Sequence, residues 1–159
     1  MPKLARTIRF DDSDARVYAR AAESGEWAIP GGFEFSNWSE GDLAGKARQS
    51  FANGWLSLEG FGRATLVAVA QIEAAEVDAL TDRLADHFVH LYGAPDRATA
   101  LPAAREEIAF MQDLCADHDP NVILIVQREL TEAGVRESFR AITPAEAEIG
   151  IVAIHGTPD

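Results

Sequence analysis

The hydrophobic pattern of this chain is strongest over residues 65–92, where an apolar run leads directly into a helical repeat. Residues 65–72, TLVAVAQI, are mostly apolar and rich in β-branched side chains. The run is too short for a typical helix, so it predicts a buried strand. Apolar residues then recur three or four positions apart, which places them on one face of a helix. These residues are Val77, Leu80, Leu84, Phe88 and Leu91. We therefore expect a helix over 74–92 that packs across the strand.

A strand and a helix are also predicted in the second half of the chain. Residues 102–118 predict a second long helix, because Pro102 suits a first turn and apolar positions again follow helical spacing. Residues 122–126, VILIV, are apolar throughout and predict a central strand covered on both faces. Both helices fall between this strand and the strand at 65–72. That order favours a crossover connection that makes the two strands parallel.

The residues after the second strand alternate between apolar and polar positions. One face of the alternating segment consists of Val135, Glu137, Phe139 and Ala141. We predict a β-hairpin over residues 127–142, with its turn over 131–134 and with Glu129 and Arg136 opposed across the two arms. A helix over 131–141 is the alternative.

Shorter strand patterns lie towards the two ends of the chain. Residues 4–10 predict a strand, and residues 17–22 predict its partner after an acidic turn. Residues 26–36 contain the turn sequence PGG and predict a hairpin or a loop with strand-like arms. Residues 149–154 predict the last strand.

Together these elements predict an α+β fold. We expect a mixed, mostly antiparallel sheet of about five or six strands with two long helices packed against it. A ferredoxin-like arrangement of the second half fits the same pattern. Residues 1–159 contain no internal repeat and no linker long enough to divide them, so they predict a single domain. Edge strands at the N-terminus or at 135–142 favour a homodimer by sheet extension.

Composition and charge narrow the classes of partner. The chain has 26 acidic and 14 basic residues and a formal net charge of −12, which argues against nucleic acid and anionic membranes as partners. No segment has the roughly 20 apolar residues of a membrane span, and the N-terminus lacks a signal-peptide core. Cys115 is the single cysteine, which fits a reducing compartment. We therefore expect a soluble, cytoplasmic protein.

Residues 37–63 combine aromatic and basic side chains in an otherwise acidic chain. Asn37 or Ser39 is expected to cap a short helix that runs to about Phe51. One interpretation is a surface that binds a protein partner or a small anionic ligand, with the cations directed at a carboxylate or phosphate. The candidate binding residues are Trp38, Lys46, Arg48, Trp55, Phe61 and Arg63. The alternative is that the aromatic residues fill the core and the cations pair with surface acids.

Two pairs of candidate metal ligands lie on the predicted helices. His87 and His90 are three positions apart on the first helix, and Cys115 and His118 are three apart on the second. Imidazole and thiolate are good zinc ligands, but helical projection turns His90 towards solvent. His87, Cys115 and His118 therefore remain as candidate ligands with an open position. The alternative is a buried cysteine with ordinary helix-end histidines.

Catalytic motifs are missing from the sequence. There is no GxSxG elbow, and residues 41–47, GDLAGKA, have alanine where a phosphate loop needs serine or threonine. The stretch GKARQSFANGWLSLEGFGR, with PGGFEF before it, resembles a family of small uncharacterised bacterial proteins, a domain of unknown function, over the whole chain. The resemblance implies an association with accessory genes of molybdenum-dependent formate dehydrogenases. It implies a non-catalytic helper role and assigns no residue a function.

Two functions are therefore expected from the sequence. The first is a small non-catalytic accessory or interaction protein that uses residues 37–63. The second is a metal- or small-molecule-binding enzyme with a site between the two predicted helices.

Overall fold

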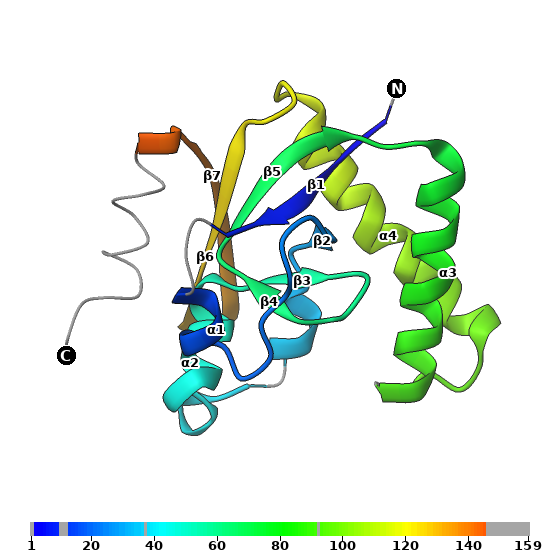
Figure 1. Cartoon of the computed structure of the whole chain (residues 1–159). Coiled ribbons are helices and arrows are strands. Elements are labelled where there is room, and N and C mark those ends of the chain that lie inside the picture. The colour runs from blue at the N-terminus through cyan, green and yellow to red at the C-terminus, as the bar shows by residue number, and fades with distance from the viewer. Residues whose placement is uncertain (1, 10–12, 37, 92, 146–159) are drawn as a thin grey trace.

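The protein is built on a curled antiparallel sheet, with one long helix packed against the sheet and a second packed alongside the first (Figure 1). The computed structural model describes residues 2–9, 13–36, 38–91 and 93–145. In these residues the strands are β1 (Lys3–Ile8), β2 (Trp27–Ile29), β3 (Trp55–Ser57), β4 (Arg63–Ala64), β5 (Leu66–Gln71), β6 (Ile123–Thr131) and β7 (Gly134–Ile142). The α-helices are α1 (Ser13–Val17), α2 (Gly45–Asn53), α3 (Ala74–Leu91) and α4 (Arg97–Ala116). Two 3₁₀ turns, η1 (Gly32–Phe35) and η2 (Glu40–Asp42), lie between β2 and α2.

The predicted α+β class is confirmed, although the sheet contains more strands than expected. The strand order is β4-β3-β2-β1-β5-β6-β7, and all neighbouring strands are antiparallel. The described residues thus contain seven strands, where five or six were predicted. The additional members are short, since β2, β3 and β4 have only two or three residues each.

The prediction that the strands before and after the long helices are parallel is wrong. β5 pairs with β6 in the antiparallel sense, with Val67 opposite Leu124. The reason is that α3 and α4 form a helical hairpin. The first helix carries the chain away from the end of β5, and the second carries it back to the same end. A ferredoxin-like second half needs a crossover between parallel strands, and the described strands contain no such pair.

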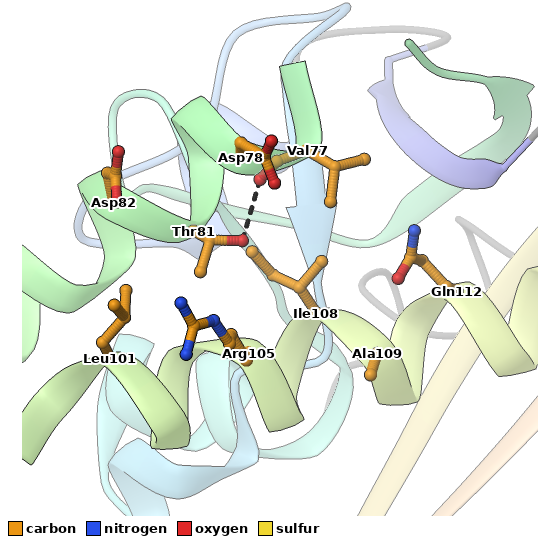
Figure 2. Close-up of a pocket in the computed structure, with 9 residues that line it drawn as sticks. All are labelled: Val77, Asp78, Thr81, Asp82, Leu101, Arg105, Ile108, Ala109 and Gln112. Atoms are coloured by element: carbon orange, nitrogen blue, oxygen red, sulfur yellow. Dashed lines mark hydrogen bonds between the residues drawn. The ribbon is translucent and has the colours of Figure 1, made fainter. Parts of the chain in front are cut away.

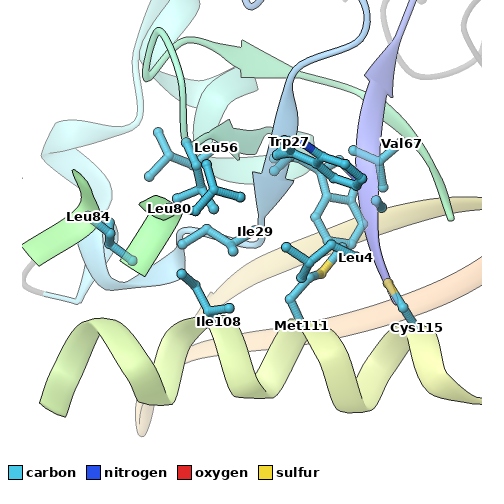
Figure 3. Packing of buried hydrophobic residues seen from close by; sticks show 14 of the residues in the cluster. Leu4, Trp27, Ile29, Leu56, Val67, Leu80, Leu84, Ile108, Met111 and Cys115 are labelled. Atoms are coloured by element: carbon cyan, nitrogen blue, oxygen red, sulfur yellow. The ribbon is translucent and has the colours of Figure 1, made fainter. Parts of the chain in front are cut away.

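The main core lies between the sheet and the face of α4 that the sequence predicts. Figure 3 shows Ile108, Met111 and Cys115 projecting from α4 towards Leu4 and Ile29 of the sheet. All five are almost completely buried. Their spacing on α4 is the helical spacing seen in the sequence, so apolar burial determines which face of the helix meets the sheet.

The second long helix begins five residues before the predicted start. Asp96 caps it, and its carboxylate accepts a hydrogen bond from the Thr99 amide at 2.8 Å. Pro102 therefore lies inside the helix. It has no N–H to donate to the Ala98 carbonyl, so the helix lacks this one hydrogen bond near its start.

The N-terminal segments differ from their predicted conformations. Residues 17–22 do not form a strand; Ser13–Val17 is helix α1, and only Ala21 bridges to Arg63. Buried Asp14 anchors this helix to the sheet, because its carboxylate accepts a hydrogen bond from the Thr65 hydroxyl at 2.9 Å. Backbone hydrogen bonds of 2.8 Å from Ala22 to Arg63 and from Arg63 to Arg20 hold the following segment against β4.

The helix expected to run from residue 39 to about Phe51 is interrupted. Ser39 does start a helical turn, and its amide donates to the Asp42 carboxylate at 2.8 Å. That turn ends at Asp42, and α2 begins separately at Gly45. In residues 26–36 the first strand-like arm is present as β2, but the second arm is the 3₁₀ turn η1.

The predicted hairpin of β6 and β7 is confirmed, and the alternative of a helix over 131–141 is wrong. Glu129 lies opposite Arg136, and their side chains form an exposed ion pair at 3.1 Å. Such a pair contributes at most about 1 kcal/mol. β7 is an edge strand among the described residues, and the homodimer by sheet extension stays a prediction. The strand predicted at 149–154 lies outside the described residues. No described helix has both the length and the apolar character needed to cross a bilayer.

A substitution at Gly62 tests how closely the backbone of the N-terminal segment packs against the sheet. A Cβ at this position would lie 2.7 Å from backbone atoms of Ala21 and Ala22, which cannot retreat without breaking their bonds to β4. We expect Gly62→Ala to lower the free energy of unfolding by about 1–3 kcal/mol in urea denaturation. Gly41→Ala is the control, because the nearest atom to its Cβ is Ser39 Oγ at 3.8 Å. Equal stability of the two variants would contradict this packing.

Candidate functional site

Two buried arginines hold together the loops near one end of the sheet. Arg63 donates to the carbonyls of Pro30 and Gly54 at 3.3 and 3.1 Å. Arg128 donates to the same two carbonyls, at 2.9 Å for Gly54. We call Arg63 and Arg128 the arginine pair. It joins the segment after β2 to the end of α2, although these segments are distant in sequence.

The aromatic ring of Phe35 lies close to both guanidinium groups. Its centroid is 4.7 Å from the Arg63 Cζ and 5.1 Å from the Arg128 Cζ. Each arginine also has a carboxylate partner: Glu34 for Arg63, and Glu137 for Arg128 at 2.7 Å. Burial, and next the positive charge of Arg63, lower the pKa of Arg128 to about 10. The guanidinium is therefore still charged at neutral pH.

A pocket opens beside the arginine pair, between η1, α4 and the start of β7. Its volume is about 500 Å³. We call it the acid–aromatic pocket, because two carboxylates and two phenylalanines are among its lining side chains. The lining residues are Pro30, Gly32, Phe33, Ser36, Glu107, Phe110, Ala133, Gly134, Val135 and Glu137. Phe110 is 47% exposed, which is unusual for a large apolar side chain.

Arg128 and Gly32 determine where the Glu137 carboxylate lies. The Nε of Arg128 donates to one Glu137 oxygen at 2.7 Å. The same carboxylate lies so close to the Cα of Gly32 that a Cβ there would collide with it. The absence of a side chain at position 32 therefore allows Glu137 to approach the loop and face the pocket.

Glu107 is the second carboxylate of the pocket, and its charge is not neutralised. In the described part of the chain no lysine or arginine forms an ion pair with it. Its pKa is raised, first by partial burial and then by the negative charges of Glu137 and Glu106. The acid–aromatic pocket thus has a negative electrostatic potential, and a bound cation would stabilise the ionised carboxylates.

A second cavity lies further along α4, towards its N-terminus. It has a volume of about 450 Å³ and is mostly apolar. We call it the apolar cavity; it is lined by Phe33, Glu34, Ser36, Phe88, Ala94, Thr99, Ala100 and Ala103. Phe33 and Ser36 line both cavities, so the two meet there. The ring of Phe33 packs edge-on against that of Phe88, with centroids 4.9 Å apart.

A third hollow lies between the two long helices (Figure 2), where the sequence predicts an enzyme site. Arg105 and Gln112 of α4 border it together with Asp78 and Asp82 of α3. The Thr81 hydroxyl donates to its own helix at the Val77 carbonyl, 2.8 Å away, and so is not directed at a ligand. None of the three candidate metal ligands lines this hollow.

The candidate metal ligands lie in different surroundings. His87 stacks on Phe61 with ring centroids 3.7 Å apart. Cys115 is fully buried, and burial raises the pKa of its thiol to about 12, which disfavours the thiolate that a metal needs. His118 follows α4, and its backbone carbonyl accepts a hydrogen bond from Lys3. Among the described residues, no three ligand-type side chains are grouped to hold a metal ion.

The candidate binding residues of segment 37–63 are likewise dispersed. Trp55 and Arg63 are buried, so they support the fold and cannot face a partner. Trp38 is partly buried and packs on Phe35, with ring centroids 4.8 Å apart. Phe61 is covered on one side by His87. Lys46 and Arg48 are exposed on α2, apart from these aromatic residues.

Sequence analysis did not identify the two pocket carboxylates. A signal existed for Glu137, because it occupies the apolar face of β7 between Val135 and Phe139. A charged side chain at such a position needs a partner, and here the partner is Arg128. Glu107 gave no such signal, since it looks like an ordinary solvated acid next to Glu106.

Glu107 is expected to reduce stability at neutral pH. Its pKa in the folded protein is raised above the ordinary value of 4.5. Folding therefore becomes less favourable as the pH rises from about 4.5 through the folded-state pKa. Glu107→Gln removes the charge and should raise the free energy of unfolding near pH 7.5, with the difference vanishing below about pH 4. Urea denaturation at both pH values tests this.

The matched control is Asp113→Asn, at an exposed acid of the same helix whose replacement should change stability little. A Glu107→Gln protein that is less stable than the wild type at both pH values would show that the carboxylate is satisfied within the fold.

Comparison with known proteins adds a family but no activity. Neither the curated proteins nor the solved structures contain a match to this chain. The resemblance to a domain of unknown function is confirmed, but nothing in the match links the family to formate dehydrogenases or to bacteria. Residues 1–159 match one family over their whole length, and the chain therefore belongs to the family of unknown function DUF6505.

Proposed function

We propose that this protein is a non-catalytic interaction protein that receives a basic side chain of its partner in the acid–aromatic pocket. The observation that carries the proposal is Glu107, a partly buried carboxylate that faces a second carboxylate, Glu137, without a cation of its own. Natural proteins rarely retain such a charge inside a pocket unless it has a use. A lysine or arginine from outside is its complementary partner.

The aromatic walls of the pocket support the same occupant. Phe33 and Phe110 line it together with Pro30, so the methylene stem of a lysine or arginine can pack on apolar surface. The charged group at the end of that stem can then reach the carboxylates and approach an aromatic face. The net charge of −12 would also attract basic segments from a distance.

Binding is favoured over chemistry by the arrangement of the carboxylates. Glu137 is held by Arg128 in a charge-assisted hydrogen bond, which stabilises its ionised form. The described residues lining the pocket include no cysteine, histidine or lysine, and Ser36 is the only hydroxyl. The lining thus lacks a nucleophile with an adjacent base.

This proposal keeps the interaction role expected from the sequence but changes the surface. The expected surface was segment 37–63, whereas the pocket combines residues 30–36 with α4 and β7. An accessory role beside molybdenum-dependent formate dehydrogenases, which the resemblance implies, indicates one set of partners to screen. A small anionic ligand fits this pocket poorly, because Glu107 and Glu137 would repel it.

The proposal predicts selective binding of a lysine side chain. In an NMR titration, Nα-acetyl-lysine methylamide should bind, and its Nζ-acetylated form should not, because acetylation removes the charge. Glu107→Gln should weaken binding at least about tenfold, since a hydrogen bond to a charged group contributes about 1.5–3 kcal/mol.

Asp113→Asn, at an exposed acid of the same helix, is the control for net charge and should leave this binding unchanged. Equal binding of the charged and acetylated probes, or equal weakening by both variants, would contradict a cation site at Glu107.

A further inference from the structure

The acid–aromatic pocket and the apolar cavity together form one groove along α4. The helix contributes Glu107 and Phe110 to the first and Thr99, Ala100 and Ala103 to the second. These five residues lie three, four or one positions apart, so they occupy one face of the helix. At about 1.5 Å per residue the centres of the two cavities lie roughly 12 Å apart.

From this groove we infer that the partner presents an extended segment with a basic residue and a large apolar residue four positions apart. In an extended chain, side chains two and four positions apart point to the same side, at about 3.3 Å per residue. Four positions span about 13 Å, which matches the separation of the cavities. The basic side chain enters the acid–aromatic pocket, and the apolar one enters the apolar cavity.

The shape of the groove favours an extended segment over a helix. Phe33 and Ser36 divide it into two cavities of about 500 and 450 Å³, so it accepts separate side chains better than the continuous ridge of a helix. The rim is open, since Phe110, Thr99 and Ala103 are exposed. An open rim leaves the backbone of a peptide in contact with water and with the hydroxyls of Ser36 and Thr99.

Charge complementarity supports a basic segment. The described residues that line the two cavities include three glutamates, Glu34, Glu107 and Glu137, and no lysine or arginine. Arg63 pairs with Glu34 and Arg128 with Glu137, which leaves Glu107 as the glutamate of this set that forms no ion pair among the described residues. The apolar cavity, by contrast, is dominated by Phe88 and small alanines.

The inference rests on the proposed function. A series of peptides with lysine alone, or with lysine and leucine, tests the two claims independently. The host is a nine-residue glycine–serine peptide with an N-terminal fluorophore, used in fluorescence anisotropy. One peptide carries lysine alone. In the others, a leucine stands three or four positions before the lysine, or three or four positions after it. We expect leucine at four positions to tighten binding about tenfold over lysine alone in one direction, and leucine at three positions to add little.

A pair of variants tests where the leucine lies. Ala103→Gln places a larger polar side chain in the apolar cavity and should abolish the gain from leucine while leaving binding of the lysine-only peptide unchanged. Ala109→Gln is the matched control, because Ala109 is an exposed alanine of the same helix that faces the hollow between α3 and α4. It should leave both peptides unaffected.

The possible failures are distinguishable. If the lysine peptide binds through Glu107 but leucine adds nothing at any spacing, the extended two-residue partner is wrong and the proposed function stands. If a helical peptide with the two residues seven positions apart binds more tightly, the partner is a helix and the inference is overturned. If no lysine peptide binds, the proposed function itself is overturned.

Discussion

The structure depends on the hydrogen bonds that Arg63 and Arg128 donate to the carbonyls of Pro30 and Gly54. The fold buries both guanidinium groups, and the removal of such charges from water is unfavourable unless their donors are satisfied. Here the donors are satisfied by loop carbonyls, two carboxylates and the face of Phe35. Short strands such as β2, β3 and β4 could not by themselves fix the loops between them. The arginine pair performs that task.

The same interaction creates the candidate site. Because the arginine pair holds the segment after β2, Phe33 is placed at the junction of two cavities, and Glu137 is aligned at the edge of one of them. Arg63 and Arg128 form ion pairs with Glu34 and Glu137, but neither arginine forms an ion pair with Glu107. We therefore expect the unpaired Glu107 carboxylate to lower the stability of the fold, as is common where a protein retains a residue for binding.

The sequence predicted those parts of the fold in which a long periodic pattern determines the structure. The buried face of α4, the helix α3 and the β6–β7 hairpin follow directly from apolar spacing. Strands of two or three residues have no period to detect, so β3 and β4 were not predicted, and β2 was predicted only as a strand-like arm of residues 26–36. The direction of β6 was wrong because two helices in succession, and not one, connect it to β5. The pocket could not be predicted, because Arg128 meets carbonyls about 75 and 100 positions away in the chain.

Mapping a bound lysine–leucine peptide onto the protein by backbone amide chemical shifts tests the central claim most directly. The claim is that the loop held by the arginine pair, together with α4 and β7, forms a groove for a basic segment. We expect the largest shifts at Phe33, Ala103, Glu107 and Glu137. Shifts confined to the exposed cations of α2, or to the hollow between α3 and α4, would contradict it.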